Sequence, residues 1–156
     1  LFNDINFYIE YYNYYMNSQE KLQRAMEYAM IHRPAVGGFP FLAECLRKAG
    51  VKRNIWSLPA VQSMYVMEDD EIVNQGIPLL SGVAKIPRFD ESALVAALRV
   101  DQAGNSTFPE FLVSAWNAGV VGYEVDFSNR KVDYWGVNGE RYTESYPAIE
   151  IPEFVL

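Results

Sequence analysis

The sequence predicts an α+β protein in which helices pack on one side of an antiparallel sheet. Two pairs of segments carry apolar residues at helical spacing, and each pair is followed by segments with the two-residue alternation of strands. The chain has 156 residues, half of them hydrophobic and 15% aromatic, which is enough to bury one sizeable core. Because the order helix, helix, strands occurs twice, we expect a tandem duplication of a helix–helix–β-hairpin unit.

The first 15 residues differ in composition from the rest and predict an N-terminal appendage. This segment holds five of the eleven tyrosines and no Lys or Arg. Its apolar residues follow a three- and four-residue spacing that favours a helix, although an irregular arm stays open as the alternative. Residues 16–156 then form a single α+β domain made of two similar halves, over about 18–87 and 88–151.

In the first half, the spacing predicts a helix over 18–32, opened by a capping box of Asn17 and Glu20. A second helix begins at Phe39–Pro40 and ends at Gly50, where proline and glycine suit the first turn and the C-terminal end. Strands follow over 51–58 and 63–67, with a hairpin to residues 72–73. Residues 79–86, flanked by two prolines, predict a further short strand at a sheet edge.

In the second half, Asp90 can cap a helix that closes at Gly104, and Thr107 with Glu110 forms a second capping box. The helix that starts there runs to about residue 118. Strands are expected over 121–127, 132–135 and 140–146, as a meander whose last turn, Asn138–Gly139, is typical of type I′. The tail after Pro147 should be extended.

The two halves match at a fixed offset of 69 residues. Phe39–Pro40 aligns without a gap on Phe108–Pro109, Gly50 on Gly119, and Tyr65 on Tyr134. A groove between two such units would be a natural ligand site.

Charge and cysteine content exclude several classes of function. The chain has 13 Lys and Arg and 20 Asp and Glu, and the resulting net charge of −7 disfavours binding to nucleic acid. The longest uncharged stretch is too short and too polar to span a membrane, so no membrane is expected as a partner. A single cysteine, Cys45, indicates a reducing cytoplasm, and we expect no metal and no cofactor.

The nucleophile and carboxylate candidates have plain structural interpretations. Cys45 shares a helix face with Leu42 and Leu46, which predicts a buried, inert thiol rather than a nucleophile paired with His32. The acidic run at 68–71 is expected to be a solvated turn. Glu124, Asp126 and Asp133 can share one wet sheet face, where they keep that face hydrated or, less plausibly, supply a general acid and base.

The aromatic residues carry the stronger functional signal. Val132 and Tyr134 belong to one face of their strand and Trp135 to the other, so one face would present Trp135, and Tyr142 with it, to a partner. The candidate binding residues are Trp56, Tyr65, Asp101, Trp116, Tyr123, Tyr134, Trp135 and Tyr142; catalytic residues are not assigned.

These residues favour a non-catalytic binding or structural module that acts through an exposed aromatic surface, with a protein partner or a second copy as ligand. Two alternatives stay open. A small enzyme would need a deep pocket between the halves with a titrating group such as Asp101, Glu44 or Cys45 inside. A carrier of a small apolar ligand would need an enclosed cavity lined by Trp56 and Trp116.

Several strings resemble a known bacterial family. They are Gly38 to Val51, Asn74 to Pro78, Asp101 to Glu110, Trp116 to Val120 and Tyr134 to Pro147, and they span roughly residues 18 to 151. The chain is similar to an uncharacterised family that includes the prophage-encoded YbcV-like proteins, often labelled "phage envelope protein". The resemblance implies a phage-related role but assigns no catalytic residue.

Overall fold

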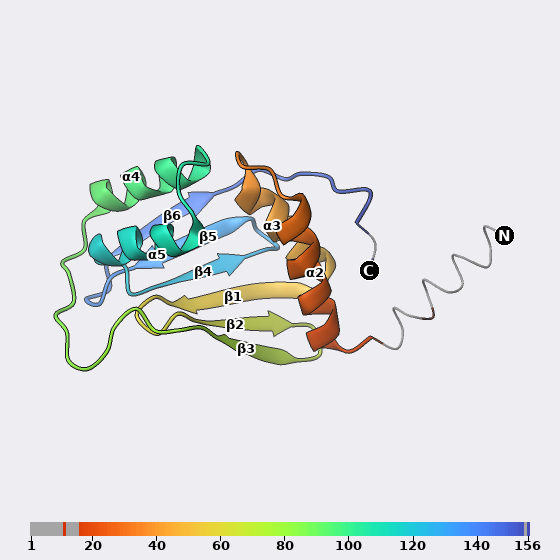
Figure 1. Ribbon diagram of the computed structural model, residues 1–156, viewed down its shortest axis with the longest axis horizontal. Helices are drawn as coiled ribbons and strands as arrows, with labels where there is room; N and C mark the ends of the chain where they lie inside the picture. Colours follow the sequence, from red (N-terminus) through yellow and green to blue (C-terminus); the bar gives the residue numbers. More distant parts are fainter. Residues whose placement is uncertain (1–10, 12–15, 155) are drawn as a thin grey trace.

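The computed structural model describes residue 11, residues 16–154 and residue 156 of the chain. The N-terminal appendage predicted over 1–15 therefore lies outside the described residues, apart from Tyr11. The described part contains two helix pairs, each followed by three strands (Figure 1). The helices are α2 (Ser18–His32), α3 (Gly38–Lys48), α4 (Glu91–Gln102) and α5 (Phe108–Asn117).

Six strands form one antiparallel sheet in the order β3-β2-β1-β4-β5-β6. They are β1 (Val51–Ser57), β2 (Gln62–Met67), β3 (Glu71–Gln75), β4 (Gly122–Asp126), β5 (Lys131–Trp135) and β6 (Arg141–Ser145). The two central strands, β1 and β4, come from different halves of the chain. Their pairing joins both halves into one continuous sheet.

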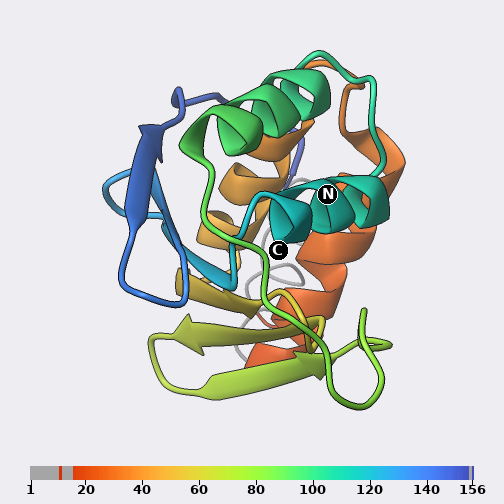
Figure 2. The same cartoon turned by 90° about the vertical axis from the view of Figure 1, so that its left-hand side faces the viewer.

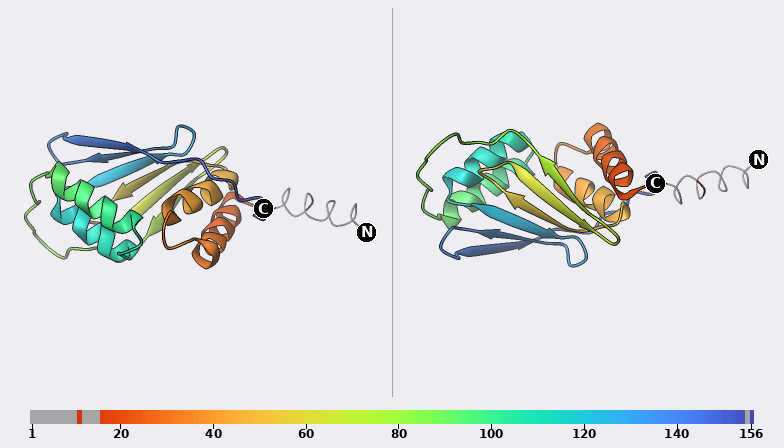
Figure 3. Two further views of the ribbon diagram at one scale, coloured as in Figure 1. Left: turned by 90° about the horizontal axis from the view of Figure 1, so that it is seen from above. Right: turned by 90° about the horizontal axis from the view of Figure 1, so that it is seen from below.

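Both helix pairs cover the same face of the sheet, and none of the helices that the structure describes lies on the other face (Figure 3). The sheet twists strongly, so its two edge strands, β3 and β6, run in clearly different directions (Figure 2). The predicted α+β fold, with an antiparallel sheet and helices on one side, is confirmed.

The helix ends follow the sequence signals. Asn17 and Thr107 each form a complete capping box, with Glu20 and Glu110 respectively, and Asp90 accepts a hydrogen bond from the amide of Ala93. These side chains satisfy amide donors that have no partner inside a helix.

The core lies between the sheet and the helices. One residue in two along β4 and β5 is buried against the helices, as the alternation of Tyr123, Val125, Val132 and Tyr134 requires. From the helices, the fully buried side chains stand at three- and four-residue spacing, for example Ala25 and Ala29, or Leu94 and Leu98.

The strand registers repeat with the offset seen in the sequence. Asn54 pairs with Tyr65 in the first half and Tyr123 pairs with Tyr134 in the second, each residue 69 positions further on. The environments of the two matching helix starts differ, however. Phe39 packs edge-on against Tyr146, whereas Phe108 packs edge-on against Trp56, so a common origin of the two halves stays a prediction.

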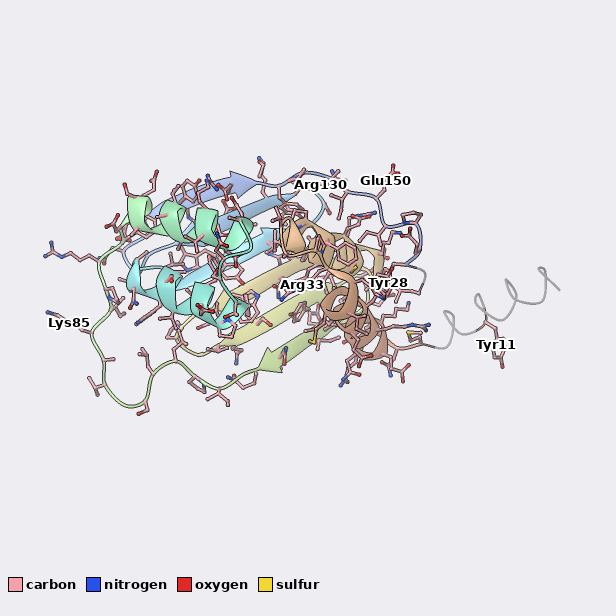
Figure 4. The ribbon with its side chains drawn as sticks, turned by 45° about the horizontal axis from the view of Figure 1, so that its top comes forward. Tyr11, Tyr28, Arg33, Lys85, Arg130 and Glu150 are labelled. Carbon is pink, nitrogen blue, oxygen red and sulfur yellow. The ribbon has the colours of Figure 1, made fainter. Side chains whose placement is uncertain are left out.

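Two local predictions are wrong. Residues 79–86 form no strand, because Gly82 adopts a left-handed φ of 70° and its neighbours run exposed along the end of the sheet, where Lys85 points outward (Figure 4). The turn before β6 is not type I′, since Gly139 has a positive φ of 88° and Asn138 does not. In that turn the Gly136 amide donates to the carbonyl of Glu140, and the Gly139 amide donates to the carbonyl of Gly136.

The C-terminal tail crosses back from β6 to the first helix pair (Figure 1). Ile151 and Phe154 are buried there, and the Phe154 ring lies 4.5 Å from that of Tyr28. Lys48 donates to the carbonyl of Ile151. The expected extended tail is corrected at residues 151–154, which form a turn in which the Phe154 amide donates to the Ile151 carbonyl. Through these contacts the tail attaches the second half to the first.

Candidate functional site

A cavity of about 430 Å³ lies between the two helix pairs, above the β4–β6 half of the sheet. Its size is within the range of small-molecule sites in proteins. Its walls come from the α2–α3 connection and the start of α3 (Val36, Gly37, Phe39, Pro40), from α4 (Leu98, Arg99, Asp101, Gln102), from α5 (Phe108, Phe111), from the sheet (Tyr123, Val132, Tyr134) and from residues 144–147.

Aromatic rings form much of the wall. Tyr123 and Tyr134 lie side by side on neighbouring strands, with ring centroids 5.4 Å apart. Phe39 and Phe108 enter from the starts of α3 and α5. Because each of these helices begins above the sheet, its first turn places a phenylalanine over the strands. The result is a cavity lined mainly by apolar surface.

Two tyrosine hydroxyls are the unusual polar feature of this cavity. Tyr123 and Tyr134 are each only 6% exposed, and both line the cavity. Among the residues that the structure describes, neither hydroxyl has a hydrogen-bond partner. Burial raises the pKa of both phenols, and neighbouring negative charges, including that of Asp101, raise it further, so both stay protonated.

Asp101 adds a carboxyl group to the lining of the same cavity. It lies in the last turn of α4, half-buried, and accepts a hydrogen bond of 3.0 Å from the Ser106 hydroxyl. Burial raises the pKa of Asp101, while the Ser106 hydrogen bond and the charge of Arg33 act in the opposite direction. A carboxylate can accept about four hydrogen bonds, so this one keeps most of its capacity free.

The second carboxylate of the cavity, Glu144 on β6, is already satisfied. It accepts from Arg99 at 2.6 Å, from Gln102 at 3.0 Å and from the Tyr142 hydroxyl at 3.0 Å. Burial alone would raise the pKa of Glu144, but these hydrogen bonds outweigh it and the pKa is lowered. The Arg99–Glu144 pair is therefore a neutral part of the cavity wall, and the two groups fix α4 to β6.

Three of the eight predicted site residues line this cavity: Asp101, Tyr123 and Tyr134. Two more lie next to it. Trp56 stacks on Tyr123 with centroids 5.9 Å apart, and Tyr142 binds Glu144. Five of the eight residues thus lie at or beside the cavity, and their role in binding stays a prediction.

The other three lie elsewhere, and of the two residues expected on an exposed aromatic face, Trp135 lies on the uncovered face and Tyr142 does not. Tyr65 and Trp116 are buried in the core. Trp135 is half-buried on the uncovered sheet face, with the Arg141 guanidinium 5.8 Å from the ring centre. Tyr142 does not share that face, because it pairs directly with Tyr134 and so points towards the helices.

The cavity residues that were not among the predicted ones include Phe39, Phe108, Arg99 and Glu144. The sequence offered a signal for the two phenylalanines, because they align as the first residues of the matching helices in the two halves. In a duplicated fold, such equivalent positions can lie at the boundary between the halves. Glu144 could have been found from its alternation with Tyr142 and Tyr146 along β6, which places all three on the covered face. Nothing in the sequence pairs it with Arg99.

The other candidates of the enzyme alternative lie outside the cavity. Cys45 is fully buried, and desolvation raises the pKa of its thiol to about 11, which confirms the buried thiol. Glu44 forms a two-pronged pair with Arg47, at 2.7 and 2.9 Å, which holds its pKa low. Asp101 is the one residue of that set that reaches the cavity.

The uncovered face of the sheet holds the carboxylates that were expected to share a wet face. Glu124 lies directly across from Asp133, and Arg53 binds Glu124 at 3.1 Å. Within residues 16–154, no three acidic, histidine or cysteine side chains are grouped as metal ligands would be. No described helix is both long enough and apolar enough to cross a bilayer.

Fold and site together define a class: a single-sheet α+β protein with an aromatic cavity that lies between two helix pairs. Residues 33–145 match the model of the family of proteins of unknown function called DUF1398, and the chain belongs to that family. It is 52% identical over 129 residues to the uncharacterized protein Rv2012 of Mycobacterium tuberculosis H37Rv and, equally, to the uncharacterized protein Mb2035 of Mycobacterium bovis. The alignment covers 83% of this chain and 79% of each relative.

Proposed function

We propose that this protein is a non-catalytic binding module that holds a small organic ligand in the cavity between its helix pairs. The observation that carries the proposal is a cavity of about 430 Å³ with mainly apolar and aromatic walls, where the hydroxyls of Tyr123 and Tyr134 have no hydrogen-bond partner among the described residues. These hydroxyls can donate to or accept from a ligand and so orient it in the cavity.

The shape of the cavity favours a small molecule over a macromolecule. Its walls come from both helix pairs and from the sheet, so the ligand would be surrounded rather than lie on a flat surface. Mainly apolar walls with a few polar groups are the usual composition of such sites. The aromatic rings would bury the body of the ligand, and the polar groups would orient it.

The proposal also includes a cellular compartment, a surface for a protein partner and a relation to prophages. The single buried cysteine favours the cytoplasm as the compartment. A protein partner or a second copy would bind the uncovered sheet face, because the apolar side chains of Met64 and Val73 are 44% and 59% exposed there. The prophage relation rests on the resemblance to the YbcV-like proteins alone.

A small enzyme is the second candidate, and one observation favours it. The Asp101 carboxyl lies at the cavity with a raised pKa, as a general acid would. The remaining cavity groups offer no second acid or base, since Glu144 is held by Arg99 and both tyrosines stay protonated. These groups therefore favour ligand binding over catalysis.

The binding proposal is tested by filling the cavity. Val132 is buried on β5 at the cavity floor, and Val132→Phe adds a ring where there is space for it. A neutral probe, 2-phenylethanol, is titrated into the wild type and the variant and followed by NMR chemical shifts. We expect a dissociation constant below about 10 mM for the wild type and binding at least about tenfold weaker for the variant.

The matched control is Val113→Phe, the same substitution on α5 at a residue that is 46% exposed and outside the cavity. It should bind the probe as the wild type does. Thermal unfolding of both variants shows whether they fold. Equal weakening by both variants, or unchanged binding in a folded Val132→Phe protein, contradicts the cavity as the binding site.

A further inference from the structure

We infer that the ligand of this cavity is a small organic cation, a protonated amine on an apolar or aromatic body, with Asp101 as its counter-ion. The inference rests on the proposed function and specifies its ligand. It follows from the charges that line the cavity and from which of them already have partners.

The lining carries three charged side chains, and two of them neutralise each other. Arg99 and Glu144 are joined at 2.6 Å, and Gln102 and Tyr142 complete the hydrogen bonds of the carboxylate. This leaves Asp101 as the unpaired charge of the wall, with one hydrogen bond, from Ser106. The cavity therefore has a net negative charge when Asp101 is ionised.

Arg33 is a further cation near this carboxylate. It lies on the α2–α3 connection (Figure 4), and its charge acts on Asp101. Among the described residues, however, it forms no ion pair with Asp101, and it is exposed and absent from the cavity lining. Solvent screens such a charge, so the carboxylate still lacks a bonded partner.

The uncharged groups of the wall suit the same ligand. Tyr123 and Tyr134 line the same cavity as Asp101, and their hydroxyl oxygens can accept hydrogen bonds from an ammonium group there. Phe39 and Phe108 offer ring surface at the same cavity. An organic cation gains from aromatic rings as well as from a carboxylate, and the gain is larger where water is excluded.

The arrangement disfavours an anionic ligand. Both tyrosines could donate to an anion, but Arg99 is committed to Glu144, and the ionised Asp101 would repel a negative charge a few ångströms away. The net charge of −7 on the whole chain acts in the same direction.

The test compares three probes of nearly the same size: phenethylamine as the cation, 2-phenylethanol as the neutral molecule and phenylacetate as the anion. Isothermal titration calorimetry at pH 7 measures their binding to the full chain. We expect the amine to bind at least about tenfold more tightly than the alcohol, and the anion more weakly than either.

Asp101→Asn separates charge from shape. The variant should lose at least about tenfold in affinity for phenethylamine and keep its affinity for 2-phenylethanol, because the asparagine oxygen still accepts from Ser106. The control is Asp69→Asn, which makes the same change at an exposed turn residue away from the cavity and should bind all three probes as the wild type does.

The two proposals fail in different ways. If the amine binds no more tightly than the alcohol, or if Asp101→Asn leaves the amine unaffected, the cation inference is overturned, while cavity binding still stands on the loss of 2-phenylethanol binding in Val132→Phe. If none of the three probes binds, both proposals are contradicted.

Discussion

The ionisation of Asp101, in the last turn of α4, affects the stability of the protein as well as the binding of the proposed ligand. Burial holds the pKa of this carboxyl above its ordinary value of 3.8, so its ionised form is less favourable in the folded chain than in the unfolded one. Between 3.8 and the raised pKa, the folded state binds more protons than the unfolded state. Stability therefore falls as pH rises through that window, and the cost is fully present above it.

Asp101→Asn removes this cost and keeps an acceptor for Ser106. We expect the stability of the variant, relative to the wild type, to be more favourable at pH 7 than at pH 3. Urea unfolding of both proteins at the two pH values measures the change, with Asp69→Asn as the matched control. A relative stability that shifts the other way between pH 3 and pH 7 would contradict the burial of an unpaired carboxylate.

At the scale of the elements, the two halves use the same helix ending in different surroundings. Gly50 and Gly119 follow α3 and α5 with left-handed φ values of 92° and 82°. A Cβ atom at Gly50 would meet only the flexible end of Met67, at 4.0 Å. At Gly119 it would lie 2.4 Å from the backbone of Arg88 and Phe89, because the chain entering α4 passes directly over this turn.

The paired substitutions Gly50→Ala and Gly119→Ala test this difference. Gly50→Ala should cost about 1 kcal/mol, the price of a left-handed conformation for a residue with a Cβ atom. Gly119→Ala should cost at least twice as much, because backbone atoms cannot move aside as a side chain can. Urea unfolding gives both values, and equal costs would show that the backbone at residues 88 and 89 does not confine Gly119.

The elements were largely predictable because their signals are local. Capping boxes at Asn17 and Thr107 and the glycines after α3 and α5 act within a few residues, so sequence alone locates these helix ends. The strand predicted over 79–86 failed because its apolar residues have no strand to pair with and Gly82 turns the chain. Strand pairing depends on segments that are distant in the sequence. A run of apolar residues does not show whether such a partner strand exists.

The site was only partly predictable for a related reason. Tyr123 and Tyr134 follow from strand alternation, and Asp101 from its place near the end of a helix. The face of Tyr142 depends on the register between β5 and β6, which the turn at residues 136–140 sets and which was predicted with the wrong geometry. That Arg99 neutralises Glu144 while Asp101 stays unpaired depends on how α4 lies over β6.

At the scale of the whole molecule, the central β1–β4 pairing and the returning tail fix the two helix pairs relative to each other. Residues of both pairs, such as Phe39 and Phe108, then line one cavity over strands of the second half. The cavity therefore exists only in the assembled fold. Neither helix pair carries it alone.

A crystal structure of the protein grown with phenethylamine is the most direct test of an organic cation bound at Asp101. We predict electron density for the probe inside the cavity, with its nitrogen within hydrogen-bond distance of Asp101 and of at least one of the Tyr123 and Tyr134 hydroxyls. Density on the uncovered sheet face alone, or an empty cavity in crystals saturated with the amine, would contradict the account.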